Sequence, residues 1–147
     1  MTEPVNAPKR LLDWEKRLAQ HFESSRRRLF AWGSFDCALA VCVGIHAITG
    51  VDPGAAFRET YHTKEEAIKL LGSEGLGNFV ASIAAQYNFR ELRPTFAGRG
   101  DIALVDNGDP GQALGTVDLS GRYAWCVSDQ GFVRVPMGRW LRAWKIG

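Results

Sequence analysis

The sequence is poor in the residues that build disulfide frameworks, metal clusters and membrane spans. Its 147 residues include three histidines and three cysteines, and the cysteines at positions 37, 42 and 126 are odd in number and irregularly spaced. That usage is typical of reduced intracellular thiols. The longest uninterrupted apolar run, Ala38 to Ile45, is far shorter than a bilayer-crossing helix, and the first ten residues lack the apolar segment of a secretory signal. These absences predict a chain that is cytoplasmic at synthesis and has no membrane span of its own.

Neither sign of charge is in large excess, since 18 Lys and Arg residues face 16 Asp and Glu residues and the formal net charge is only +2. A balance this small does not indicate a nucleic-acid partner. The densest basic run, Arg26 to Arg28, is best explained as a solvated helix end, and a nucleic-acid-associated factor would rest on that run alone. The segment GSEGLG at 72–77 lacks the Lys-Ser/Thr pair of a phosphate-binding loop. We therefore expect no nucleic-acid partner and no cofactor.

The first half of the chain has helical periodicity and helix-ending residues. Asp36 is a good N-cap, and Gly50 is a good residue to end the helix that follows it. Thr63 and Glu66 have the spacing of a capping box. The expected helices cover residues 9–25, 37–49, 64–71 and 76–87. The helix over 37–49 has apolar residues on every side, which predicts that it is buried at the centre of the domain.

After Arg90 the pattern changes to short β-type runs separated by Gly, Asp, Asn, Ser and Pro. We expect an antiparallel meander over about 91–147, with a last strand over 141–146 that brings Trp144 back onto the sheet. Helices over about 9–90 followed by strands predict one α+β domain spanning 1–147, with the central helix packed on the sheet.

Cys37 is the residue that most directly suggests chemistry. A thiol at a helix N-terminus feels the positive end of the helix dipole, which favours the thiolate that nucleophilic catalysis requires. Asp36 opposes this electrostatically unless its carboxylate is engaged in capping. The alternative is a buried structural thiol, a common role of free cysteine and the one expected for Cys42.

Four short motifs, in order along the chain, carry a resemblance. They are Trp32-Gly33-Ser34-Phe35-Asp36-Cys37, Thr49-Gly50-Val51-Asp52-Pro53, Gly100-Asp101 and Ala143-Trp144. The first resembles the W-G-x-x-D-C segment of NlpC-type cell-wall peptidases, and "RGDIALVD" at 99–106 is similar to their G-D-L strand. The whole set resembles a small uncharacterised family encoded in phages, prophages and gene-transfer-agent clusters. The resemblance implies a papain-like α+β fold, with Cys37 as nucleophile and Asp36 as helix cap and orienter.

The base histidine of those peptidases is missing. In active relatives it begins the strand after G-D, and the matching position here is Ala113. His46 lies nine residues beyond Cys37 on the same helix, about 13 Å along its axis, so it cannot pair with the thiol. His21 or His62 would reach Cys37 only if tertiary packing brought its imidazole there. The other possible source of a base is a partner chain. Without a base, the cysteine route loses a contribution of typically ~10²–10⁴-fold in rate.

Other polar residues give no second site. Cys42 and His46 share a helix face, but two ligands are too few for zinc, so we expect no metal. The aspartates at 52, 101, 106 and 109 look like turn and cap residues and not an acid–base pair.

Two functional hypotheses follow from the resemblance and from Ala113. The favoured one is a non-enzymatic tail-tip or tail-assembly component, built on a degenerate NlpC-like fold, made in the host bacterium and assembled into the virion tail. It docks on other tail proteins, for which Trp140, Trp144 and Phe132 are candidate exposed contacts, the alternative being that each is a core residue. The alternative is an active cysteine peptidase or amidase acting on peptidoglycan peptides, with Cys37 as nucleophile.

Overall fold

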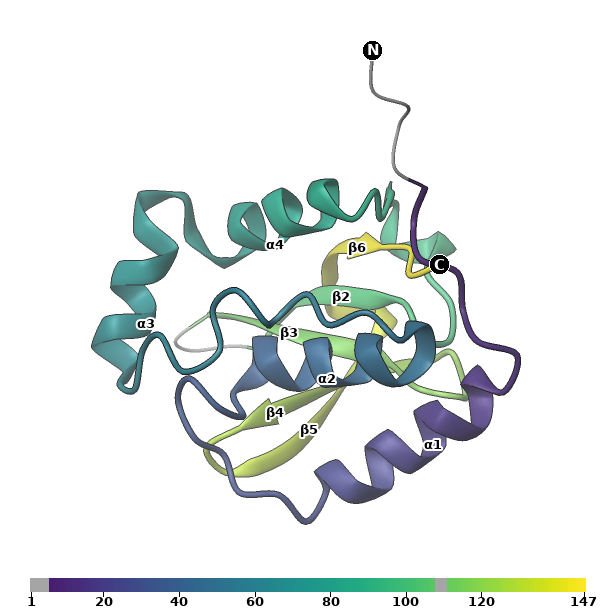
Figure 1. Ribbon diagram of the computed structural model, residues 1–147, viewed down its shortest axis with the longest axis horizontal. Coiled ribbons are helices and arrows are strands. Elements are labelled where there is room, and N and C mark those ends of the chain that lie inside the picture. The colour runs from purple at the N-terminus through teal and green to yellow at the C-terminus, as the bar shows by residue number, and fades with distance from the viewer. Residues whose placement is uncertain (1–5, 108–110) are drawn as a thin grey trace.

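The computed structural model describes residues 6–107 and 111–147. These residues form an α+β structure with four α-helices and one six-stranded antiparallel sheet (Figure 1). The helices are α1 (Trp14–Ser25), α2 (Cys37–Thr49), α3 (Lys64–Leu71) and α4 (Gly75–Gln86). The strands are β1 (Glu91–Leu92), β2 (Ile102–Asp106), β3 (Gln112–Val117), β4 (Tyr123–Ser128), β5 (Gly131–Pro136) and β6 (Trp140–Trp144).

Helix α2 begins and ends where the local chemistry predicts. The Asp36 carboxylate accepts the backbone N–H of Leu39 at 3.0 Å, which satisfies one of the free donors of the first turn. Gly50 ends the helix with φ +82°, a left-handed conformation that glycine adopts without strain. The Thr63 hydroxyl likewise accepts the Glu66 N–H at 3.1 Å to start α3. Both predicted caps are therefore confirmed.

The sheet has the strand order β1-β6-β2-β3-β4-β5. Strands β2 to β5 form the expected meander, but β6 returns across the sheet and lies between β1 and β2. A purely local meander would have placed β6 beside β5. The sheet position of β6 instead allows Trp144, 1% exposed, to pack in the core under α2, opposite Ile102.

The two faces of the sheet bury different side chains. Helix α2 crosses one face (Figure 1), where its Val41 and Ile45 pack with Ile102, Leu104 and Leu114. The other face carries a second cluster, made mostly of small aliphatic residues of the strands together with Trp140. That second cluster is Ala97, Ala103, Val105, Ala113, Val117, Ala124, Cys126, Val135, Trp140 and Ala143.

Trp140 and Trp144 are core residues, with 5% and 1% of their surface exposed. For these two residues the core alternative is therefore confirmed, and the exposed docking patch is wrong. The indole N–H of Trp140 donates to the carbonyl of Val135 at 2.9 Å, which fixes the ring inside the second cluster. Phe132 is half-buried and packs edge-on against Trp125, so it offers only part of its ring to solvent.

The two ends of the described chain are tied together by Asp101. Its carboxylate accepts bonds from Arg10 Nη2 at 2.9 Å, the N–H of Ile146 at 3.0 Å and the N–H of Gly98 at 2.8 Å. Helix α1 therefore begins at Trp14 and not at residue 9 as expected, because the preceding residues are held by contacts with the C-terminal segment. The Leu11 N–H also donates to the carbonyl of Ile48. Among the described residues, no helix has the length and apolar character that crossing a membrane requires.

Candidate functional site

Cys37 is the first residue of α2, directly after a turn that the Asp36 carboxylate organises. Besides capping Leu39, that carboxylate accepts the N–H of Gly33 at 3.2 Å and the hydroxyl of Tyr61. Asp36 is buried, and each bond replaces water that burial has removed. The predicted role of Asp36 as a helix cap is confirmed, and its contacts orient the turn and not an imidazole.

The loop carrying Tyr61 approaches this turn so closely that residue 33 has to be glycine. A Cβ at that position would lie 1.7 Å from the carbonyl oxygen of Tyr61, and φ there is +80°. Burial and the Asp36 carboxylate both raise the pKa of the Tyr61 hydroxyl. Tyr61 therefore acts as a neutral donor at physiological pH.

The Cys37 thiol is neutral as well. Its pKa is raised to about 11, chiefly by burial and in smaller part by the Asp36 carboxylate, against hydrogen bonds from backbone N–H groups that lower it. At pH 7 a group with that pKa is ionised in only about one molecule in ten thousand. The helix N-terminus is thus outweighed by desolvation, and the thiol lacks the activation that a nucleophile requires.

Strand β3 reaches Cys37 where it separates from β4. The two strands pair at Thr116 with Trp125 and at Val117 with Ala124, and earlier residues of β3 pair with β2. The backbone N–H of Leu114 is consequently available to hydrogen-bond the sulfur of Cys37. The thiol packs against the clusters on both faces of the sheet at this point.

Ala113 and its neighbour Gln112 lie on opposite faces of β3, because side chains alternate along a strand. Ala113 belongs to the cluster of small residues on the face turned away from α2, against which Cys37 also packs. Gln112, on the same face as Leu114, lines a pocket together with Cys37. The residue of β3 that lines this pocket is therefore a neutral amide. Matching motifs pointed to Ala113 and missed Gln112. The alternation of side chains along the strand, counted from Leu114, would have indicated it.

All three imidazoles make their contacts away from the Cys37 sulfur. His21 is buried against Gly44, and its Nδ1 lies 3.3 Å from the Ser25 hydroxyl; Gly44 is seven residues, about 10 Å, beyond Cys37 along α2. Burial lowers the pKa of His21 to about 4. His46 is exposed on the last turn of α2, and His62 is exposed with Nδ1 3.8 Å from Glu59. Packing thus brings neither His21 nor His62 to the thiol.

The pocket over Cys37 has a volume of about 170 Å³ and a mostly apolar wall. Helix α3 contributes its inner residues on one side, and the turn before α2 contributes Trp32 on another. The lining residues are Trp32, Asp36, Cys37, Ala38, Phe57, Tyr61, Lys64, Ala67, Ile68, Leu70, Leu71, Leu76, Phe79 and Gln112. The chemistry offered is apolar contact, with a thiol, an amide and a lysine at the margins. Such a wall suits an apolar side chain. Among the described residues its one carboxylate, Asp36, is engaged by the N–H groups of Gly33 and Leu39 and by the Tyr61 hydroxyl, and no imidazole lines it.

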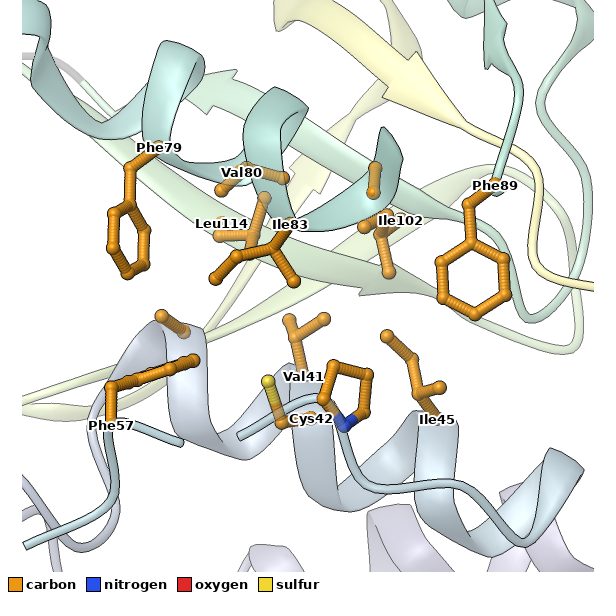
Figure 2. A pocket seen from close by; sticks show the side chains of 13 residues that line it. Val41, Cys42, Ile45, Phe57, Phe79, Val80, Ile83, Phe89, Ile102 and Leu114 are labelled. Carbon is orange, nitrogen blue, oxygen red and sulfur yellow. The ribbon is translucent and has the colours of Figure 1, made fainter. Parts of the chain in front are cut away.

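A smaller cavity of about 30 Å³ continues this pocket between α2 and α4, and both share Ala38, Phe57 and Phe79. Figure 2 shows Phe79, Val80 and Ile83 of α4 facing Val41, Cys42 and Ile45 of α2 across it. Burial raises the pKa of Cys42 to about 12, in keeping with its predicted structural role.

No metal site appears in the part of the chain that the structure describes, where no three His, Cys, Asp or Glu side chains come together. Cys42 is buried and His46 is exposed, so the two do not face a common site. Asp52 pairs with Arg58 and accepts the N–H of Gly54, as expected of a turn residue. Asp109 lies outside the described residues.

A family model described as "Domain of unknown function (DUF6950)" matches residues 9–146. Comparison with curated proteins finds no match.

Proposed function

The chain belongs to this domain family of unknown function, and we propose that it is a phage or prophage tail-associated protein using an NlpC-like, papain-like fold as a binding module. In this proposal the cleft that would hold the substrate of a cysteine peptidase receives an apolar segment of another tail protein. The tail assignment rests on the four motifs quoted above. The binding role rests on the geometry of the Cys37 pocket.

One observation carries the non-catalytic role. The thiol at the start of α2 is half-buried in the pocket wall and has a raised pKa, and the residue of β3 that lines the same pocket is Gln112. A cysteine hydrolase needs a thiolate and a base within hydrogen-bond reach of it. The apolar lining of the pocket, by contrast, is complete without either group.

The decisive experiment changes the pocket without touching the thiol. Leu76→Glu places a charge in the apolar wall, while Leu12→Glu places the same charge at a fully exposed leucine. Each variant is tested for co-purification with each tail protein encoded beside it. We expect Leu76→Glu to abolish binding while Leu12→Glu and Cys37→Ala retain it. Retention by all three variants would contradict a pocket-based contact.

The second candidate function is an active cysteine peptidase or amidase on peptidoglycan peptides. It is favoured by the position of Cys37 at a helix N-terminus and in a pocket wall. It requires a base from a partner chain, and it predicts an acidic thiol. Iodoacetamide labelling of the Cys37 peptide against pH, read by mass spectrometry, distinguishes the two: a midpoint near 11 supports the binding module, and one below 8 together with turnover of cell-wall fragments supports the enzyme.

A further inference from the structure

A second cleft shares no residue with the Cys37 pocket and lies where residues 9–14, residues 90–99 and the segment after β6 meet. Figure 1 shows the N-terminal segment passing beside the C-terminus at this place. The cleft is open and has a volume of about 850 Å³. Three segments that are distant in the sequence build its wall, held together by the Asp101 contacts described above.

Basic side chains dominate this wall. Lys9, Arg10, Arg90, Arg99 and Lys145 line it, and Asp101 is the acidic side chain among its lining residues. Five cations and one carboxylate give the lining a formal charge of +4, against +2 for the whole chain, so the remaining side chains carry −2. A terminal carboxylate at Gly147, which also borders the cleft, would still leave a cationic surplus.

Within residues 6–107 and 111–147, two of the five cations are used internally and three have no acidic partner. The guanidinium of Arg10 is used internally, by the carbonyls of Ile146 and Arg99 and by Asp101. Arg99 pairs with Glu15 at 3.0 Å.

Lys9, Arg90 and Lys145 are exposed, and within the described chain none of their side chains has a carboxylate partner. They surround an opening in which Asp101 is already saturated by three donors. The site therefore offers unpaired positive charge to an anion that arrives from outside.

An exposed aromatic ring stands at the same cleft. Phe96, at the end of the short turn 94–96 after β1, is 71% exposed. Both the Arg10 and Arg99 guanidinium groups lie over the ring of Trp14, at 4.3 and 5.4 Å from its centre, so Trp14 is already covered. Phe96 has no such cover, and its ring is available for stacking.

We infer that this cleft binds a short stretch of single-stranded nucleic acid, with phosphates at Lys9, Arg90 and Lys145 and a base on Phe96. Cationic grooves with exposed aromatic rings are the usual means of holding single strands without sequence preference. An acidic protein segment would use the same cations, but only a nucleic acid brings a flat ring for Phe96 with every negative charge. The sequence hides this arrangement because the cations and the ring come from three separate segments. The inference is independent of the Cys37 pocket.

The test is fluorescence anisotropy with a labelled oligothymidylate of about 12 nucleotides, long enough to span the cleft. With about three phosphate contacts, log Kd should change with log salt at a slope of about 2, so that binding weakens roughly 15-fold between about 50 and 200 mM salt. The double variant Arg90→Glu/Lys145→Glu should weaken binding at least tenfold and flatten this slope. Phe96→Ala should weaken it about tenfold with the slope unchanged.

The matched control is Arg26→Glu/Arg27→Glu, which makes the same charge change in the basic run beside Glu23. All of these residues are exposed, and unchanged unfolding midpoints confirm that each variant is folded. The inference is overturned by absence of binding at the lower salt concentration, or by equal losses in the control and the cleft variants. It is also overturned, in favour of an acidic protein partner, if polyglutamate competes at equal charge and Phe96→Ala binds normally.

Discussion

The hydrogen bond from Tyr61 to Asp36 gives the sharpest test of how the Cys37 turn is held. Tyr61→Phe removes only the hydroxyl, and the ring, 5% exposed, stays packed. The carboxylate keeps its bonds from Leu39 and Gly33. A hydrogen bond to a charged group contributes about 1.5–3 kcal/mol, so we expect the free energy of unfolding to fall by about 2 kcal/mol. That is a large part of the ~5–15 kcal/mol typical of a domain.

The assay is urea unfolding at pH 7 followed by tryptophan fluorescence, with the slope m expected to stay unchanged. Tyr123→Phe is the matched control, because this tyrosine is 37% exposed and its loss should change stability by less than about 0.5 kcal/mol. A double-mutant cycle with Asp36→Asn should show coupling between the two sites. If Tyr61→Phe is as stable as the control, the buried carboxylate does not depend on Tyr61 and the account of this turn is wrong.

Three further predictions concern the same core. Burial lowers the pKa of His21 to about 4 in the folded state, against about 6.5 when unfolded, so below pH 6.5 the unfolded state binds this proton more readily. The His21 contribution to stability should fall by up to about 3 kcal/mol from pH 6.5 to 4, below which the carboxylates with lowered pKa values, such as Asp52, add their own losses. In a pH series of urea midpoints, His21→Gln should lose the slope between pH 6.5 and 4. Gly33→Ala should cost more than about 3 kcal/mol or prevent folding, as circular dichroism and midpoint shifts will show, because its Cβ would overlap a loop carbonyl at 1.7 Å. Gln112→His should accelerate iodoacetamide labelling of Cys37 at pH 7, because it places an imidazole in the same pocket. Ala113→His should instead lower the free energy of unfolding by about 1–3 kcal/mol, because the larger side chain overpacks the buried face. Faster labelling in Ala113→His and not in Gln112→His would show that residue 113 faces the thiol.

Features fixed by local chemistry were predictable from the sequence. Asp36, Gly50 and Thr63 marked helix ends correctly, because a cap or a left-handed residue acts on its own turn. The place of β6 was not predictable in this way. Its pairing with β2 spans about forty residues and depends on burying Trp144 under α2, which is a property of the whole core.

The candidate site divides in the same manner. Cys37 and its cap could be placed from six consecutive residues, but the contribution of Tyr61 comes from a loop whose path is set by close packing at Gly33. The role of Gln112 depends on which face of β3 meets α2, which follows from strand register and not from residue type. The pKa of the thiol depends on burial, which no short motif specifies.

The position of β6 also determines which edges the sheet exposes when folding is incomplete. Until residues 140–144 pair, β2 exposes the edge that β6 will occupy, and β1 has no strand to pair with. A chain that has paired only β2 to β5 therefore presents an open strand edge to other chains. Substitutions that weaken the docking of β6 should accordingly promote aggregation as well as unfolding.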